Sequence, residues 1–166
     1  MITDNDDKAD DMIHLRRSIE LATEALEAGD EPFGSVLVAG DGQVLHEDRN
    51  RANSVDATYH PEIAVAQWAA KHMTAETRAQ AVVYTSGEHC AMCSAAHAWA
   101  GLGRIVYISS SKQLGKWMDE MGVSSTSPIH SLSIQEVAPN VPIEGPIAGL
   151  DEEIRALQQR SFQKNK

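Results

Sequence analysis

The sequence has few cysteines, few aromatic residues, little positive charge and no long apolar run. Two cysteines in 166 residues exclude the disulfide framework of a small secreted domain. No apolar stretch reaches the roughly 18 residues that a membrane helix needs. The acidic start also lacks the basic and then apolar character of a secretion signal. These absences predict a cytoplasmic protein that does not enter a membrane.

The charge balance disfavours polyanionic partners. The chain has 14 basic and 24 acidic residues, for a formal net charge of −10. An average field of this sign repels polyanions, so it disfavours nucleic acid and anionic membranes as partners. A small-molecule substrate is the better expectation.

Length and patterning predict one domain. Residues 1–10 are polar and mostly acidic, and they are expected to form a mobile tail. Residues 11–166 are expected to form a single domain, with a core over about 11–110. The remaining segment, about 111–166, is expected to close a pocket or to form an interface.

Apolar periodicity predicts an α/β domain. The Asp41-Gly42 pair indicates a hairpin turn between the first two strands. Strand, helix and strand in succession from residue 81 predict a βαβ crossover and therefore a layered α/β fold. The expected strands are residues 35–39, 44–46, 81–85 and 104–108, and the expected helices are 11–28, about 61–73 and 91–100.

The pattern weakens toward the C-terminus. A helix over residues 112–121 and a last strand over 131–137 are expected. Three prolines in residues 139–146 predict an irregular extended connector. Apolar residues at helical spacing from Leu150 predict a C-terminal helix.

Two short motifs contain the residues suited to chemistry. His60-Pro61-Glu62 opens one expected helix, and the run from Glu88 to Cys93 opens another. Both lie at helix N-termini beyond strands of the expected sheet, where α/β folds place their sites. One imidazole and two thiolates are ligands that zinc prefers, and three protein ligands leave a fourth position for water.

Interpretations of the same residues other than an open zinc site remain open. Cys90 and Cys93 could form a redox dithiol or be two small buried side chains. His97 lies one turn after Cys93, so a closed structural site with two cysteines and two histidines is also conceivable. The Glu62 carboxylate could simply stabilise the helix by interacting with the positive end of its dipole.

The two motifs together carry a resemblance. H-x-E followed by C-x-x-C is the signature of zinc-dependent nucleobase and nucleoside deaminases. Over residues 11–110 the sequence resembles the cytidine deaminase-like superfamily, in the branch of bacterial guanine deaminases and tRNA adenosine deaminases. Residues 31–36, EPFGSV, resemble the family's PFGAV-type segment, and residues 56–60, DATYH, resemble its approach to the ligand histidine.

The resemblance implies a fold, a metal and a catalytic residue. The fold is a three-layer α/β/α arrangement with a central mixed sheet flanked by helices. One Zn²⁺ per chain would be bound by His60, Cys90 and Cys93, and Glu62 would transfer protons. Family members are typically dimers or larger assemblies, so a homodimer is expected.

The resemblance also implies substrate contacts. Asn50 would hold the base, and Phe33 would line the pocket. Trp99 occupies a position where guanine deaminases are similar in having tryptophan, and its indole could wall in a purine. His89 replaces the family's usual proline and would lie near the metal as a ligand, proton donor or pocket wall. For the family's C-terminal aspartate near the substrate, Asp119 is the nearest candidate in sequence.

The expected reaction is hydrolytic deamination of a nucleobase or nucleoside with release of ammonia. A guanine-type purine is favoured, because of Trp99 and the acidic charge. Cytosine or another small aminated ring such as a triazine is an alternative, and a tRNA adenosine deaminase is a third. A non-catalytic zinc-stabilised interaction module is the alternative from another class, although such a module has no need of Glu62.

Overall fold

Five strands form one mixed sheet in the computed structural model, which describes residues 4–165. The strand order is β2-β1-β3-β4-β5. The strands are β1 (Gly34–Val38), β2 (Val44–Arg49), β3 (Val82–Gly87), β4 (Ile105–Ser109) and β5 (Ile143–Glu144). The helices are α1 (Asp4–Glu27), α2 (Pro61–His72), α3 (Ala75–Gln80), α4 (Ala91–Trp99), α5 (Ser111–Glu120), α6 (Ile134–Val137) and α7 (Leu150–Lys164).

Strand directions follow from the connections. β1 and β2 form an antiparallel hairpin, and β1 also pairs antiparallel with β3. The crossover through α4 makes β3 and β4 parallel, and β5 adds parallel to β4. The expected mixed sheet and βαβ unit are therefore confirmed.

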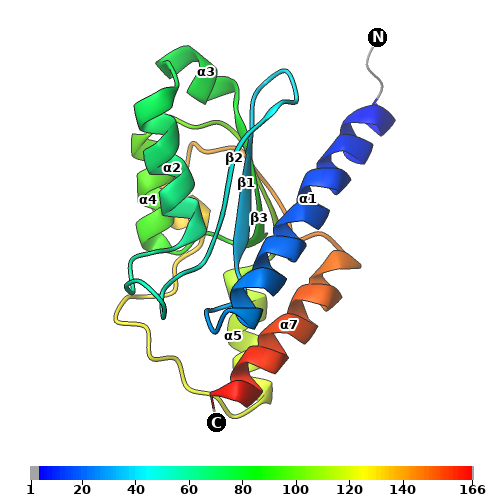
Figure 1. The fold of residues 1–166 in the computed structure, drawn as a ribbon, viewed down its shortest axis with the longest axis vertical. Helices are drawn as coiled ribbons and strands as arrows, with labels where there is room; N and C mark the ends of the chain where they lie inside the picture. Colours follow the sequence, from blue (N-terminus) through cyan, green and yellow to red (C-terminus); the bar gives the residue numbers. More distant parts are fainter. Residues whose placement is uncertain (1–3, 166) are drawn as a thin grey trace.

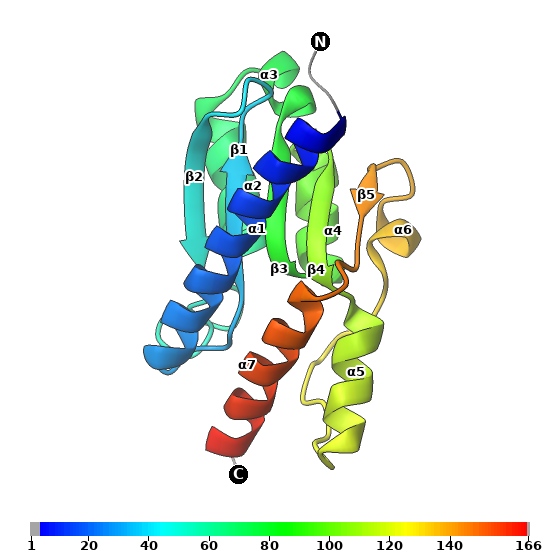
Figure 2. The same ribbon diagram turned by 90° about the vertical axis from the view of Figure 1, so that its right-hand side faces the viewer.

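Helices cover both faces of the sheet (Figures 1 and 2). Alternate residues of β1 point to opposite faces, as the period of a strand requires. Val36 belongs to a core cluster with residues of α1 and α7, whereas Leu37 belongs to a second cluster with residues of α2 and α4. The domain thus has three layers, α1 and α7 on one face and α2 and α4 on the other.

The layer of α2 and α4 positions the chemistry. The two helices pack against each other. Pro61 is the first residue of α2, where its missing N–H costs no hydrogen bond. Residues at the N-termini of both helices therefore lie close together.

Several expected boundaries were wrong. The expected tail over residues 1–10 is helical from Asp4 in the described residues, because acidic residues favour the first turns of a helix. Residues 1–3 lie outside the described residues. Helix α3 was not expected.

The expected strand over residues 131–137 was also wrong. Ser133 caps α6 instead, in a capping box with Glu136. This S-x-x-E pattern overrides the weak apolar alternation. Within the expected irregular connector, Ile143 and Glu144 form the short strand β5.

Among residues 4–165, no helix is long and apolar enough to cross a membrane.

Candidate active site

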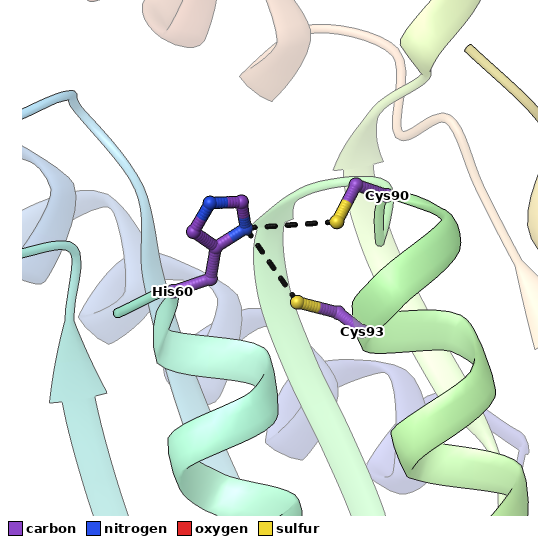
Figure 3. A group of neighbouring side chains, drawn as sticks. All are labelled: His60, Cys90 and Cys93. Carbon is purple, nitrogen blue, oxygen red and sulfur yellow. Dashed lines mark hydrogen bonds between the residues drawn. The ribbon is translucent and has the colours of Figure 1, made fainter. Parts of the chain in front are cut away.

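Three side chains from two helix N-termini converge on one point (Figure 3). His60 is the N-cap of α2, Cys90 is the N-cap of α4, and Cys93 lies in the first turn of α4. Their potential ligand atoms all lie within 4.8 Å of one another. The prediction that these residues come together is thus met by their geometry.

The spacing of the three atoms fits a tetrahedral zinc ion. His60 Nδ1 lies 3.6 Å from the Sγ atoms of both Cys90 and Cys93. Zinc bonds of about 2.3 Å to sulfur and about 2.05 Å to nitrogen at the tetrahedral angle place nitrogen and sulfur about 3.6 Å apart. The equal distances from one nitrogen to two sulfurs match this tetrahedral geometry.

The three side chains of the group shift one another's pKa values. Hydrogen bonds from Cys93 and from His60 lower the pKa of Cys90 to about 4, against the opposing effect of burial. The hydrogen bond to Cys90 and the charge of Glu62 raise the pKa of His60 to about 9, again against burial. The Cys90 thiolate is therefore stable at neutral pH, and a thiolate is the form that binds zinc. The hydrogen bond to Cys90 and burial raise the pKa of Cys93, so binding of an ion would release the protons that Cys93 and His60 hold.

Glu62 is buried beside this group. Its side chain is 5% exposed, and burial raises its pKa to about 7. Thr85 Oγ1 lies 3.4 Å from Glu62 Oε1 and 2.9 Å from the hydroxyl of Ser35. A carboxyl with a pKa near neutrality can both accept and release a proton.

Asn50 lies on a loop that is fixed by buried hydrogen bonds. Its own N–H donates to Phe33 O at 3.0 Å, and its Oδ1 accepts the N–H of Ala52 at 2.9 Å. Oδ1 is thus occupied, and the Nδ2 hydrogens are the group that Asn50 can offer to a ligand. The ring of Phe33 packs against Gly87 at the end of β3, where a side chain would collide with it.

Asp30 fixes the same loop through hydrogen bonds. Its Oδ1 accepts the backbone N–H groups of Asn53 and Ser54 at 3.0 and 2.8 Å. Its Oδ2 accepts from the Ser54 hydroxyl and from Arg49. Burial alone would raise the pKa of Asp30, but these hydrogen bonds lower it overall.

Three expected substrate contacts do not fit their positions. Trp99 is 91% exposed at the far end of α4, so it does not wall a pocket within its own chain. Both ring nitrogens of His89 are inaccessible, and its ring lies edge-on to that of His97, so they are not open to a substrate. Asp119 is exposed near the end of α5, about 12 Å of helix beyond its start.

The closed four-ligand alternative is also wrong. His97 Nε2 binds the carbonyl oxygen of Gly103 at 2.7 Å, and the ring does not join the His60, Cys90 and Cys93 group. Three protein ligands leave the open position that a catalytic site needs.

Sequence reasoning missed residues that support the site through hydrogen bonds. Thr85 and Ser35 lie on buried strands, and their polar character was the available signal. Glu88 was noted only as part of a motif, although its carboxylate accepts the N–H groups of Ser111 and Ile134. These contacts join segments far apart in sequence, so no local pattern indicates them.

Comparison with known proteins agrees with this geometry. The model of the MafB19-like deaminase family matches residues 9–146. The chain belongs to this family. A probable cytosine deaminase of Schizosaccharomyces pombe is 32% identical over 134 residues, which are 81% of each protein. The guanine deaminase of Bacillus subtilis is 37% identical over 95 residues, which are 56% of this chain and 60% of that protein.

Solved structures show the same fold. The guanine deaminase of Nitrosomonas europaea superposes with a TM-score of 0.68 at 17% identity, over 90% of this chain and 83% of that one. The resemblance inferred from the two motifs is thus confirmed. Family membership supports a hydrolytic deaminase that acts on nucleobases or nucleosides.

Proposed function

We propose that this chain is a zinc-dependent aminohydrolase that removes an exocyclic amino group from a nucleobase or nucleoside. The observation that carries the proposal is the placement of His60 Nδ1 at 3.6 Å from both cysteine sulfurs. His60, Cys90 and Cys93 would hold the ion. Bound zinc supplies Lewis-acid activation of water at neutral pH.

Glu62 would move the protons. Thr85 lies against Oε1, so Oε2 is the oxygen that would take a proton from the attacking water. Glu62 would then deliver it to the ring nitrogen beside the reacting carbon, and later assist the departure of ammonia. General acid–base catalysis of this kind contributes about 10²- to 10⁴-fold.

Asn50 and Phe33 would position the ring. The Nδ2 hydrogens of Asn50 would donate to an acceptor on the base, because its Oδ1 is already bound to Ala52. Phe33, which immediately precedes β1, is half-buried against Gly87 at the end of β3, where its aromatic face would border a flat substrate. Neither role needs a positive surface, in keeping with the net charge of −10 and a small-molecule substrate.

The type of reaction and the identity of the substrate rest on different observations. The exposed position of Trp99 removes one argument for guanine, so a guanine-type purine is now supported by the similarity to guanine deaminases. Cytosine is the second candidate, because a probable cytosine deaminase matches 81% of the chain. A homodimer and a cytoplasmic location stay predictions.

The test is ammonia release by zinc-loaded protein from guanine, guanosine, cytosine, cytidine, adenine, adenosine and ammeline. We expect turnover of at least one compound, and a fall in kcat of about 10²- to 10⁴-fold in Glu62→Gln. Glu76→Gln, an exposed carboxylate on α3, is the matched control and should act as wild type. Two results would contradict the proposal: no ammonia release from any of these compounds by protein with zinc bound, or full activity in Glu62→Gln.

A further inference from the structure

Glu88 lies in the turn that leads from β3 to the candidate zinc ligands of α4. β3 ends at Gly87, and Cys90, the N-cap of α4, comes two residues after Glu88. The backbone N–H of Glu88 donates to the carbonyl oxygen of Ser109, the last residue of β4, at 2.8 Å. Figure 2 shows the ends of β3 and β4 near the start of α5. The turn is therefore fixed to the end of the neighbouring strand.

The Glu88 carboxylate accepts one hydrogen bond at each oxygen. Oε1 accepts the N–H of Ser111, the first residue of α5, at 3.0 Å. Oε2 accepts the N–H of Ile134, the first residue of α6, at 2.9 Å. The first N–H groups of a helix have no acceptor within the helix, so they bind acceptors from outside it. One half-buried carboxylate thus joins the turn before Cys90 to two later segments.

Both helices also have caps of their own. Ser110 and Gln113 form a capping box at the start of α5, and Ser133 and Glu136 form one at the start of α6. Each box binds N–H groups of its own segment. The hydrogen bonds of Glu88 differ, because they join residues 23 and 46 positions apart and lead to the ligand turn.

The position of this turn determines the spacing of the ligand atoms. Cys90 and Cys93 follow the turn directly, whereas His60 comes from another helix, α2. Metal sites keep their metal–ligand distances to within about 0.2 Å. The separations of 3.6 Å from His60 Nδ1 to both sulfurs therefore depend on where the start of α4 is held.

We propose that Glu88 is a positioning residue for the zinc site. By binding the first N–H groups of α5 and α6, it holds the turn that presents Cys90 and Cys93 to the ion. Glu88 is not a member of the group that could hold the metal. The segments that begin at Ser111 and Ile134 thus contribute to zinc affinity without providing a ligand. This inference rests on the proposed function, because zinc is the ion that the group would hold there.

The experiment measures zinc affinity, so it does not depend on turnover. Zinc is titrated into chelator-stripped wild type, Glu88→Gln and Ser111→Pro in competition with a chromogenic chelator. In Glu88→Gln, an amide NH₂ replaces one carboxylate oxygen and cannot accept a hydrogen bond. Ser111→Pro removes one of the two N–H donors instead. Proline suits the first position of α5, because Ser110 before it is extended.

Two variants are matched controls. Glu136→Gln makes the same change of charge at the start of α6, at a carboxylate that accepts the N–H of Ser133. Ala75→Pro places proline at the first position of α3, where the N-cap Thr74 is extended in the same way as Ser110. Denaturant unfolding of each metal-free protein is measured in parallel, which separates a loss of stability from a loss of zinc affinity.

We expect Glu88→Gln and Ser111→Pro each to raise the Kd of zinc about tenfold, as is typical when a residue that orients metal ligands is lost. The controls should change the Kd less than about twofold. In the double variant the amide NH₂ can face the proline, which has no N–H, so the Kd should again rise about tenfold rather than about 100-fold.

Several results would overturn the inference. One is a zinc Kd within about twofold of wild type in Glu88→Gln together with a loss of stability, because Glu88 would then only cap two helices. Another is an equal rise in the Kd of the controls, and a third is an additive loss in the double variant. If Glu88→Gln does not fold, the comparison of Ser111→Pro with Ala75→Pro decides.

The proposed function can fail separately. If the two variants weaken zinc binding as expected while wild type releases no ammonia, deamination is wrong and the role of Glu88 stands. If wild type deaminates a compound of the panel and both variants bind zinc as wild type does, the role of Glu88 is wrong and deamination stands. Absence of zinc binding by wild type would overturn both.

Discussion

Two histidine-containing clusters flank α4, and they differ in what their nitrogens meet. In the first, His60 Nδ1 lies between the sulfurs of Cys90 and Cys93. In the second, His89 and His97 pack ring against ring, and neither ring nitrogen of His89 has a hydrogen-bond partner among the described residues. The side chains of the first cluster could hold a metal ion, whereas the ring nitrogens of His89 in the second are buried.

The two clusters include one pair of neighbouring residues. His89 and Cys90 are neighbours, and the backbone of Cys90 is extended, so their side chains point to different sides. Burial keeps the pKa of His89 well below its usual value, so the ring is neutral and acts as a packing group. Convergence at a helix N-terminus, rather than the number of nearby histidines, therefore defines the site.

The largest expected difference between the clusters is in metal content. We expect about one zinc per chain in the wild type and a zinc content near zero in His60→Ala after dialysis against a chelator. His60→Ala should also lose its activity. His97→Gln should keep its zinc, because Nε2 of His97 forms a hydrogen bond with the carbonyl oxygen of Gly103 and takes no part in the ligand group. Elemental analysis of both variants checks this, and zinc loss in His97→Gln alone would reverse the assignment.

A buried side chain that accepts several hydrogen bonds should contribute more to the free energy of unfolding than a buried side chain without hydrogen-bond partners. Asp30→Asn should lower the free energy of unfolding by about 1–3 kcal/mol near pH 7, because Asp30 accepts hydrogen bonds from Asn53, Ser54 and Arg49. Chemical denaturation measures this loss, with the exposed Asp119→Asn as control.

The pH dependence of this effect has a defined sign. The folded-state pKa of Asp30 is lowered below its ordinary value of 3.8, so its contribution is fully present above that value. It is lost as the pH falls through the folded-state pKa. The difference between wild type and Asp30→Asn should therefore shrink below about pH 4, and a difference that grows in acid would contradict the account.

A smaller effect is expected at the partner of Glu62. Thr85→Val keeps the shape of the side chain but removes the hydroxyl that contacts Glu62 Oε1 and Ser35. One hydrogen bond of about 1 kcal/mol corresponds to a fall in kcat of about fivefold. Steady-state kinetics test this with zinc content measured in parallel, and an unchanged kcat would show that Thr85 does not assist Glu62.

The smallest effect is expected at the buried His89. His89→Leu removes two buried nitrogens that have no partner, so the free energy of unfolding should change by less than about 1 kcal/mol. Zinc content should also stay at wild-type level. Thermal unfolding and metal analysis check both, and a loss of metal would show that His89 supports the ligand group.

Local sequence predicted the ligand group because helix starts follow from short patterns. His60-Pro61-Glu62 and the C-x-x-C pair each indicate a helix N-terminus, and the α/β layering brings such ends together. Trp99 and His89 were misplaced because their exposure depends on the direction of side chains around α4. Spacing from a ligand does not determine that direction.

The C-terminal part was harder to predict because its contacts are distant. The two hydrogen bonds accepted by Glu88 join residues 23 and 46 positions apart. The start of α6, in contrast, was readable from Ser133 and Glu136, a capping box that the strand-like apolar pattern obscured.

The proposed deamination depends on one zinc ion that His60, Cys90 and Cys93 would hold. The most direct measurement titrates zinc into chelator-stripped protein while ammonia release is followed. We expect the rate to rise linearly with added zinc and to saturate at about one zinc per chain. Full activity in the stripped protein, or stoichiometric zinc binding that restores no activity on any compound of the panel, would contradict it.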